Sequence, residues 1–182
     1  MKKTVFTEFG NPTLRKKAKK VAVSFLNTNK SKALFKKMFG LMRKSNGVGL
    51  AAPQIGLSLQ IVVAEIRPTS TRKKLKRSLP SVLINPKVVE FSKSVASDYE
   101  GCLSLPGIYA KVPRSTSVVV QYLNEYGQRV TEKASGLWAR IYQHEIDHLN
   151  GICFMDRVKD MRTVVTLSEL KKLNKVSKIK KK

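Results

Sequence analysis

Residues 136–151 read GLWARIYQHEIDHLNG, and this stretch decides most of the fold because it predicts a helix with one buried face. Four of its residues recur at steps of four, three and four positions, which places them on one side of a helix. These residues are Leu137, Ile141, His144 and His148. Asn150-Gly151 supplies a stop signal after the last apolar residue. We therefore expect a helix over Gly136–Leu149 that carries two histidines on its buried side.

The two histidines lie four residues apart, a little over one helical turn, so both imidazoles can share one metal ion. Taken alone, the HExxH pattern is equally compatible with ordinary surface histidines. Here His144 and His148 lie on the apolar face, where unpaired imidazoles are costly to bury, and this favours a ligand role. Glu145 sits one position round the helix, close enough to act on a water molecule without being a ligand.

The third ligand distinguishes between enzyme classes. The chain has only two histidines, so this ligand must be a thiolate, a carboxylate or a group from outside the chain. A metzincin protease would carry its third histidine where this chain has Phe154, which excludes that class. Glu169 lies about where a thermolysin-like protease keeps its ligand carboxylate. A capping box beside Lys171 and Lys172 explains Glu169 without a metal.

The two cysteines differ in their surroundings. Cys153 follows the helix stop too closely to fold back easily onto the histidine pair, and a small buried hydrophobic role suits it better. Cys102 lies in a turn bracketed by Gly101 and Gly107, where a backbone can approach a ligand closely. A cysteine with two histidines gives three ligands and an open position, the arrangement of a catalytic ion.

Composition defines the broad class. The chain has 182 residues, 42% of them apolar, which is enough for one domain with a hydrophobic core. The chain has no run of about 18 apolar residues, so no transmembrane helix is predicted. Its first residues resemble the start of a signal peptide, but Glu8 and Gly10 interrupt the pattern. Two cysteines cannot form a disulfide framework, so we expect a reducing compartment. We expect residues 1–182 to form a single domain whose basic tail spans about residues 163–182.

Lys and Arg number 36 against 12 Asp and Glu, which gives a formal charge of +24. The excess lies in residues 2–20, 67–77 and 162–182, whereas residues 100–151 hold five acids and five bases. We expect the middle basic run to lie in an exposed loop over residues 67–80. This distribution is typical of a neutral body whose periphery faces a polyanion, although a solvated, merely solubilising surface would also produce it.

Two further helices are predicted. Apolar residues at helical spacing cover residues 31–46, with a stop signal at Asn46-Gly47. A capping box at residues 166–169 opens a last helix that runs into residue 182.

The remaining pattern predicts strands. One is expected over residues 59–64, and an extended segment over 82–91 is broken at Pro86, which predicts a sheet edge. Residues 117–123 and 128–134 predict a hairpin with a four-residue turn. The expected fold class is α+β, with mainly antiparallel strands packed around the central metal-binding helix and a helix at the C-terminus.

Three blocks of the chain resemble the peptide deformylases. They read GVGLAAPQ at 47–54, EGCLS at 100–104 and QHEIDHLNG at 143–151, in the order that the family has them. Ile84-Asn85-Pro86 is also similar. The resemblance implies a hydrolase that removes formate from N-formylmethionyl peptides emerging from the ribosome. It also implies one divalent metal ion, Fe(II) as the working ion, with Zn(II), Ni(II) or Co(II) as substitutes.

The resemblance gives each catalytic candidate a role. The ligands of the ion, which acidifies a water molecule, would be Cys102, His144 and His148. Glu145 would take the proton of this water and later deliver one to the leaving amine. The side-chain amide of Gln54 and the backbone N–H of Leu103 would stabilise the oxyanion. Without the other two blocks, Gln54 is equally well explained as a polar turn residue.

The same resemblance implies a set of substrate-binding residues. Those that present backbone groups to an extended peptide, like an added strand, are Gly47, Val48 and Gly49. Leu137 and Ile141 would line the methionine pocket, a role that is compatible with core packing. The second block adds Glu100 and Gly101 to this set.

One position departs from the family pattern. Many deformylases carry Arg seven positions after the ligand cysteine, paired with the acid of the second block, whereas this chain has Tyr109. Glu100 must therefore find another partner, and Arg114 or Arg140 could serve. Residues 134–140, ASGLWAR, resemble the more organelle-like branch of the family, in which some members also lack that Arg.

The implied partners are nascent formylmethionyl peptides and, through the basic C-terminal tail, the ribosome surface near the exit of the nascent chain. We expect no membrane association and no sequence-specific nucleic-acid binding. The implied location is the bacterial cytoplasm or an organelle of bacterial origin. Because the three blocks end at Gly151, we expect a truncation after Asp160 to leave activity on a short soluble formyl-peptide largely intact, while ribosome affinity falls.

Two other classes remain open at this point. A basic RNA-binding protein with a relic metal site would keep the charge and lack turnover. An endopeptidase would cut inside chains and would not need a formyl group.

Overall fold

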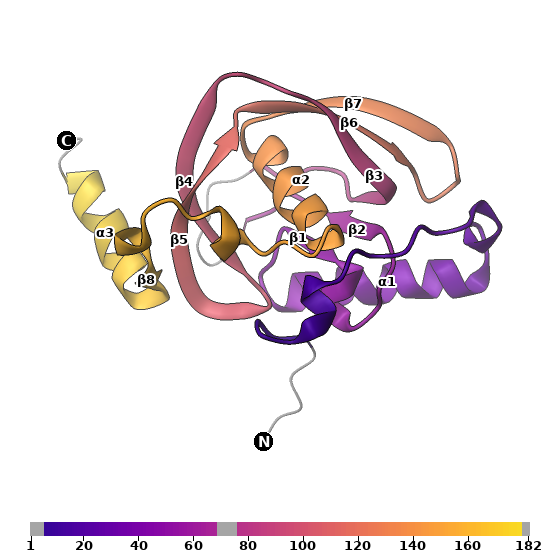
Figure 1. Ribbon diagram of the computed structural model, residues 1–182, viewed down its shortest axis with the longest axis horizontal. Helices are drawn as coiled ribbons and strands as arrows, with labels where there is room; N and C mark the ends of the chain where they lie inside the picture. Colours follow the sequence, from indigo (N-terminus) through magenta and orange to yellow (C-terminus); the bar gives the residue numbers. More distant parts are fainter. Residues whose placement is uncertain (1–5, 69–75, 180–182) are drawn as a thin grey trace.

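The computed structural model describes residues 6–68 and 76–179, with side chains described to residue 173. In this part of the chain two antiparallel sheets enclose a central helix (Figure 1). The five-stranded sheet has the order β1 (Gly49–Ala51), β2 (Ile61–Ala64), β3 (Ser81–Phe91), β6 (Ser117–Leu123) and β7 (Arg129–Ser135). The three-stranded sheet has the order β4 (Val95–Cys102), β5 (Leu105–Ser115) and β8 (Val165–Thr166).

Three α-helices and five short 3-10 helices complete the described fold. The α-helices are α1 (Asn29–Lys44), α2 (Gly136–Leu149) and α3 (Leu167–Ile179). The 3-10 helices are η1 (Pro12–Arg15), η2 (Val23–Phe25), η3 (Ala52–Ile55), η4 (Phe154–Arg157) and η5 (Met161–Thr163). Mixed helices and antiparallel strands confirm the predicted α+β class.

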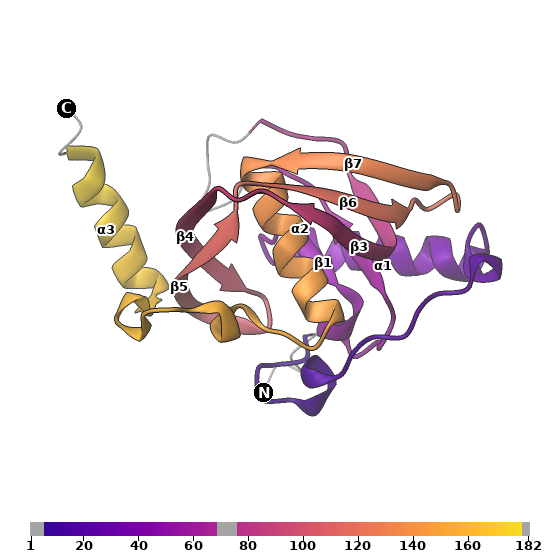
Figure 2. The same ribbon diagram turned by 45° about the horizontal axis from the view of Figure 1, so that its top comes forward.

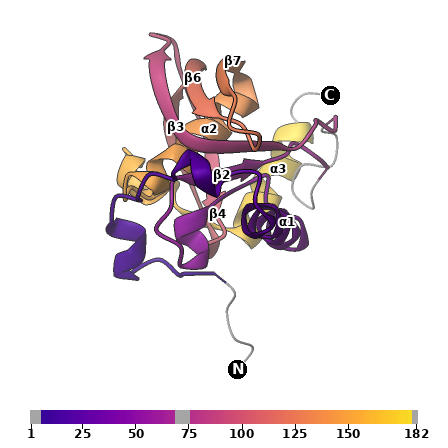
Figure 3. The ribbon, with the colours of Figure 1, turned by 90° about the vertical axis from the view of Figure 1, so that its right-hand side faces the viewer.

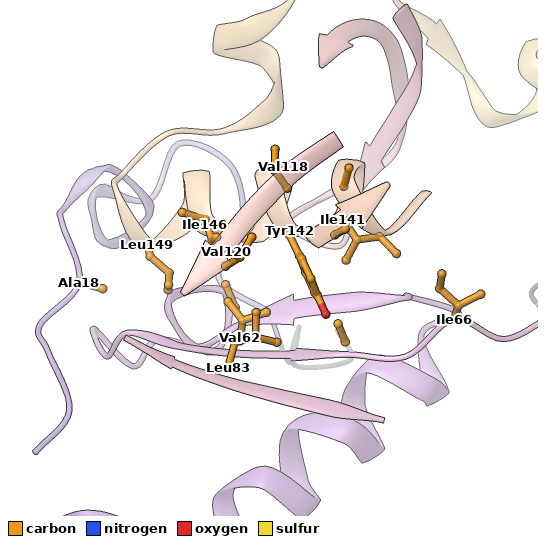
Figure 4. Close-up of a cluster of buried hydrophobic side chains, with 14 residues drawn as sticks. Ala18, Val62, Ile66, Leu83, Val118, Val120, Ile141, Tyr142, Ile146 and Leu149 are labelled. Carbon is orange, nitrogen blue, oxygen red and sulfur yellow. The ribbon is translucent and has the colours of Figure 1, made fainter. Parts of the chain in front are cut away.

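Helices cover both faces of the five-stranded sheet, and β2 shows why. Val62 faces the cluster that includes Tyr142 and Ile146 of α2, as Figure 4 shows. Its neighbours Ile61 and Val63 face the opposite way, into a cluster with residues of α1. Successive side chains of a strand point to opposite faces, so a strand that is apolar throughout is buried on both. Helix α2 consequently lies between the two sheets, while α1 lies outside β1 and β2 (Figures 2 and 3).

The local predictions agree with most of these elements. Helix α2 has the predicted bounds, and Asn150 forms its C-terminal cap. Helix α1 begins two residues before the predicted start, because the side chain of Thr28 accepts a hydrogen bond from the backbone N–H of Ser31. Strands β6 and β7 form the predicted hairpin, with Leu123 paired to Arg129, so that the loop spans residues 124–128 and is one residue longer than the predicted turn.

The prediction that the segment around Pro86 lies at a sheet edge is wrong. Strand β3 is the third of five and pairs with both β2 and β6. Its register with β6 shifts between Ile84 and Lys87, so the proline lies in an irregularity where no backbone N–H is needed. Asn85 adopts a positive φ of 49° there, and its side chain bonds the backbone of Val21. The proline therefore marks an irregularity inside the sheet, where the sequence suggested an edge.

The C-terminal segment starts on the body of the protein and then leaves it. Strand β8 pairs with β5 through Val165 and Tyr109, and α3 follows directly. The hydroxyl of Thr166 accepts a hydrogen bond from the backbone N–H of Glu169, as expected for the predicted cap. Helix α3 projects away from the sheets (Figure 2). Residues 180–182 of the predicted helix lie outside the described part, as do residues 69–75 of the predicted loop. None of the described helices has the length and apolar character that a membrane span requires.

Candidate active site

Helix α2 holds two imidazoles on its buried face, and the end of β4 brings a thiol against them. His144 and His148 are almost fully buried. The Sγ atom of Cys102 lies 3.2 Å from Nε2 of His148. Ligand atoms of the three residues all lie within 4.8 Å of one another. The fold thus brings together the three residues that the sequence indicates as metal ligands.

The donor set of this group fits a divalent transition metal. One thiolate and two imidazoles suit zinc, iron, cobalt or nickel. Burial raises the pKa of the Cys102 thiol, but the facing imidazoles of His148 and His144 outweigh it, so that this pKa lies well below its ordinary value. The thiolate, which is the form that binds metals, is therefore favoured.

Glu100 links the second sheet to this group. Arg114 donates to its carboxylate through Nε at 3.0 Å and Nη2 at 3.1 Å, and Arg140 donates through Nη1 at 2.7 Å. Nδ1 of His144 lies 2.9 Å from Oε2 of the same carboxylate. Burial raises the pKa of Glu100, but hydrogen bonds from His144 and Arg114 outweigh it and hold the pKa well below its usual range. The two arginines predicted as alternative partners both bind this carboxylate.

Glu145 is buried without a partner. Its Oε2 atom has no hydrogen-bond partner among the described residues. The rest of its carboxylate packs so closely against Gly49 that the glycine has no room for a Cβ. Burial raises the pKa of Glu145 above its ordinary value. A carboxyl group that holds its proton to higher pH and is not committed to another side chain suits a proton carrier.

The amide of Gln54 is fixed in orientation. This residue lies in η3, directly after β1, and its side chain is buried. Its Oε1 accepts a hydrogen bond from the backbone N–H of Ala51 at 2.8 Å, so the amide nitrogen faces the site. That nitrogen lies 3.2 Å from Sγ of Cys102 and 3.4 Å from Oγ of Ser104. A donor held in this way is available to an anionic oxygen formed beside the cysteine.

A cavity of about 520 Å³ opens over these groups. The catalytic and ligand candidates that line it are Gln54, Cys102, Leu103, His144 and Glu145. The predicted substrate-binding residues that line it are Gly47, Val48, Gly49, Glu100, Gly101, Leu137 and Ile141. Strand β1 is the first strand of its sheet, so one of its edges is open to an added strand. Of the predicted site residues, only His148 does not line the cavity; it is almost fully buried and contacts Sγ of Cys102.

A larger cavity of about 850 Å³ is lined by Gln143, Ile146 and Asp147 of the same helix. None of the candidate catalytic residues lines it.

The N-terminal segment contributes to the site, which the sequence did not predict. The backbone N–H of Thr7 donates to the carbonyl of Gln54 at 2.8 Å, and that of Phe9 donates to the carbonyl of Ser104 at 2.7 Å. Phe6 and Glu8 line the cavity. Backbone bonds between residues so distant in the chain leave no local pattern from which they could be predicted.

Tyr109 and the C-terminal segment form another wall of the cavity. Tyr109 pairs with Gly101 across the β4–β5 ladder, and its ring lies where a Cβ of Gly101 would be. Leu167, the first residue of α3, also lines the cavity. The expected survival of activity after truncation at Asp160 assumes that no later residue lines the site, and Leu167 contradicts this assumption. Strand β8 returns the chain to the cavity after the last of the three sequence blocks.

The residues set aside as ligands lie elsewhere. Cys153 is buried, as expected for a small hydrophobic residue, and does not belong to the group of three ligand atoms. Glu169 lies in the first turn of α3 and pairs with Lys172 at 2.7 Å.

Comparison with known proteins finds relatives that belong to one family. The model of the family described as Polypeptide deformylase matches residues 4–164. Peptide deformylase 2 of Nostoc sp. is 36% identical over 166 residues, which cover 91% of this chain and 92% of the relative. The peptide deformylase of Roseiflexus castenholzii is 45% identical over 146 residues, covering 76% of this chain and 78% of the relative.

Solved structures agree with this similarity. The class I type b peptide deformylase of Acinetobacter baumannii with bound Met-Ala-Ser superposes with a TM-score of 0.81 at 37% identity. The match covers 84% of this chain and 96% of that structure. Peptide deformylase 1B of Arabidopsis thaliana gives a TM-score of 0.75 at 39% identity and covers 85% of this chain and 81% of that one.

Proposed function

This chain belongs to the polypeptide deformylase family, and from that premise we propose how its own residues perform the reaction. Peptide deformylases remove the formyl group from N-terminal methionine, so the protein is a metal-dependent hydrolase that acts on nascent formylmethionyl peptides. One observation carries the assignment of residues. A Cys/His/His group, an unpartnered buried glutamate and an oriented amide surround one cavity.

The substrate backbone binds in extended form along residues 47–49. The open edge of β1 supports this, since an edge strand offers unpaired N–H and C=O groups to a peptide. The methionine side chain packs against Leu137 and Ile141, which form an apolar part of the cavity wall. Glu100 and Gly101, which precede Cys102 in β4, complete this substrate-binding set, since both also line the cavity.

Cys102, His144 and His148 hold the divalent ion. When bound, this ion acts as a Lewis acid that makes water more acidic and polarises the formyl carbonyl. Glu100 supports the ligands without binding the ion itself. It binds Nδ1 of His144, which leaves the other ring nitrogen available to the ion.

Glu145 moves the proton. Water attacks the formyl carbon, Glu145 accepts the proton of this water, and the amide carbonyl oxygen becomes negatively charged. The amide nitrogen of Gln54 and the backbone N–H of Leu103 stabilise this oxygen. Glu145 then delivers the proton to the leaving amine as the C–N bond breaks. The products are formate and a peptide with a free N-terminal methionine.

Fe(II) is the working ion, and Zn(II), Ni(II) or Co(II) can replace it. The donor set accepts all four metals, so the ion must be tested by reconstitution. Metal-free protein loaded in turn with each ion, without oxygen for Fe(II), should release formate from formyl-Met-Ala-Ser fastest with Fe(II). Faster release by the zinc form would contradict this choice.

The basic C-terminal segment binds the ribosome surface. Helix α3 projects from the body, and the exposed Lys171 and Lys172 follow its first turn, which suits a phosphate-rich surface. We place the enzyme where nascent formylmethionyl chains emerge, in the bacterial cytoplasm or an organelle of bacterial origin. The chain acts as a single catalytic domain, and its projecting tail follows Leu167, because residues 165 and 166 belong to the second sheet and Leu167 lines the cavity.

A further inference from the structure

Glu8 is held at the mouth of the active-site cavity by its two neighbours. The backbone N–H of Thr7 donates to the carbonyl of Gln54, and the backbone N–H of Phe9 donates to the carbonyl of Ser104. Gln54 in η3 and Ser104 in the turn between β4 and β5 both contact Sγ of Cys102. The backbone on both sides of Glu8 is therefore anchored to the site, while its exposed side chain lines the cavity.

The carboxylate of Glu8 is the one charge of the cavity wall that remains free among the described residues. Of the other charged side chains that line the cavity, Glu100 and Arg140 are buried and bind each other. His144 and Glu145 belong to the proposed reaction centre. Among the described residues, the Glu8 carboxylate forms no hydrogen bond and no ion pair. Arg140 is the only Lys or Arg among the described residues that line the cavity.

We propose that Glu8 determines specificity by favouring substrates with a lysine or arginine after the formylmethionine. The inference rests on the proposed function, because it assumes that the formyl group lies at Cys102 and the rest of the peptide leaves through the mouth. A chain with a formal charge of +24 repels cationic peptides over a long range. A fixed carboxylate beside the exit path offsets this repulsion locally and attracts a cationic side chain.

The test compares kcat/KM for formate release from formyl-Met-Ala-Ser, formyl-Met-Lys-Ser and formyl-Met-Ala-Lys, all with amidated C-termini, at low salt. For the Fe(II) enzyme, kcat/KM for at least one lysine peptide should exceed that for formyl-Met-Ala-Ser by roughly two- to five-fold, the scale of a solvent-exposed ion pair. Added salt should reduce this ratio. Glu8→Gln should lower the ratio to one or below, because the positive chain then repels the lysine peptides without a local offset. Glu8→Lys should shift the preference to formyl-Met-Ala-Glu. The matched control is Glu90→Gln, since Glu90 is exposed on β3 and lines neither cavity.

The outcomes separate this proposal from the enzyme assignment. Formate release without a lysine preference would overturn the role of Glu8 alone. So would a Glu8→Gln variant that lowers kcat/KM equally for all peptides, because that result indicates a structural role. A preference lost equally in Glu90→Gln would assign it to overall charge. Absence of formate from every peptide would overturn the proposed mechanism together with this inference.

Discussion

Nδ1 of His144 lies 2.9 Å from Oε2 of Glu100, and this contact joins the helix that carries the two proposed histidine ligands to the sheet that carries Cys102. The same carboxylate binds Arg114 and Arg140, and Arg114 also pairs with the buried Asp147. A buried charge that loses its partners is costly. Glu100 therefore contributes to the stability of the fold as well as to the orientation of His144.

The stability of the metal-free protein should depend on pH through Glu100. Its folded-state pKa is depressed, so its contribution is complete above the unfolded-state pKa of about 4.3 and is lost as the pH falls below that value. Glu100→Gln should lower the free energy of unfolding by about 3 to 5 kcal/mol at neutral pH. Urea titrations between about pH 6 and pH 3 should show this difference narrowing. A difference that stays constant with pH would contradict the depressed pKa.

Gln54→Ala should lower kcat by roughly 100-fold or more, the usual effect of removing one oxyanion donor. Metal content should change little, because Gln54 is a hydrogen-bond donor to Cys102 and does not belong to the proposed ligand group. Steady-state kinetics on formyl-Met-Ala-Ser with metal analysis of the same sample test this. An effect confined to KM would reassign Gln54 to substrate binding.

Cys102→Ser should abolish tight metal binding, since a hydroxyl is a far poorer ligand than a thiolate. Cys153→Ser is the matched control, because Cys153 is the other cysteine of the chain and lies outside the ligand group. Metal analysis after dialysis against a weak chelator should find the ion only in the control and in the unmodified protein. Retention by Cys102→Ser with loss from Cys153→Ser would mean that the wrong cysteine is assigned.

Two truncations should separate the cavity wall from the tail. Removal of residues after Asp160 deletes the strand that pairs with Tyr109 and also deletes Leu167, so kcat/KM on a short formyl-peptide should fall. Removal after Leu173 keeps both and should leave this activity intact. Equal activity of the two truncated proteins would show that β8 and Leu167 do not shape the site.

The shorter truncation also tests ribosome docking. It deletes five lysines, so co-sedimentation with ribosomes should weaken, and the lost binding should be the salt-sensitive part. Equal binding by full-length and truncated protein at low and moderate salt would refute the docking role and leave the deformylase assignment unaffected.

The parts of the fold that follow from short-range patterns were predictable. Helix α2 has the expected bounds because an apolar 3.6-residue period ends at Asn150-Gly151. The β6–β7 hairpin follows from alternation around one turn. Pro86 was misread as an edge signal, because a bulge removes the need for a backbone N–H as effectively as an open edge does.

The parts of the site made by distant chain segments were not predictable. Thr7 and Phe9 reach Gln54 and Ser104 through backbone bonds, which leave no trace in side-chain identity. Leu167 reaches the cavity through a two-residue strand, too short to give a periodic pattern. The HExxH pair, in contrast, is fixed by helix geometry within five residues.

The most direct test of the account is formate release from formyl-Met-Ala-Ser by the Fe(II)-loaded protein and by its Glu145→Gln variant, each with its metal content measured. The unmodified protein should release formate and the free-amine peptide in equal amounts. The variant should keep the metal and lose roughly 100-fold or more of this rate, since only the proton carrier is gone. No formate from the metal-loaded protein, or a near-normal rate in the variant, would contradict the account.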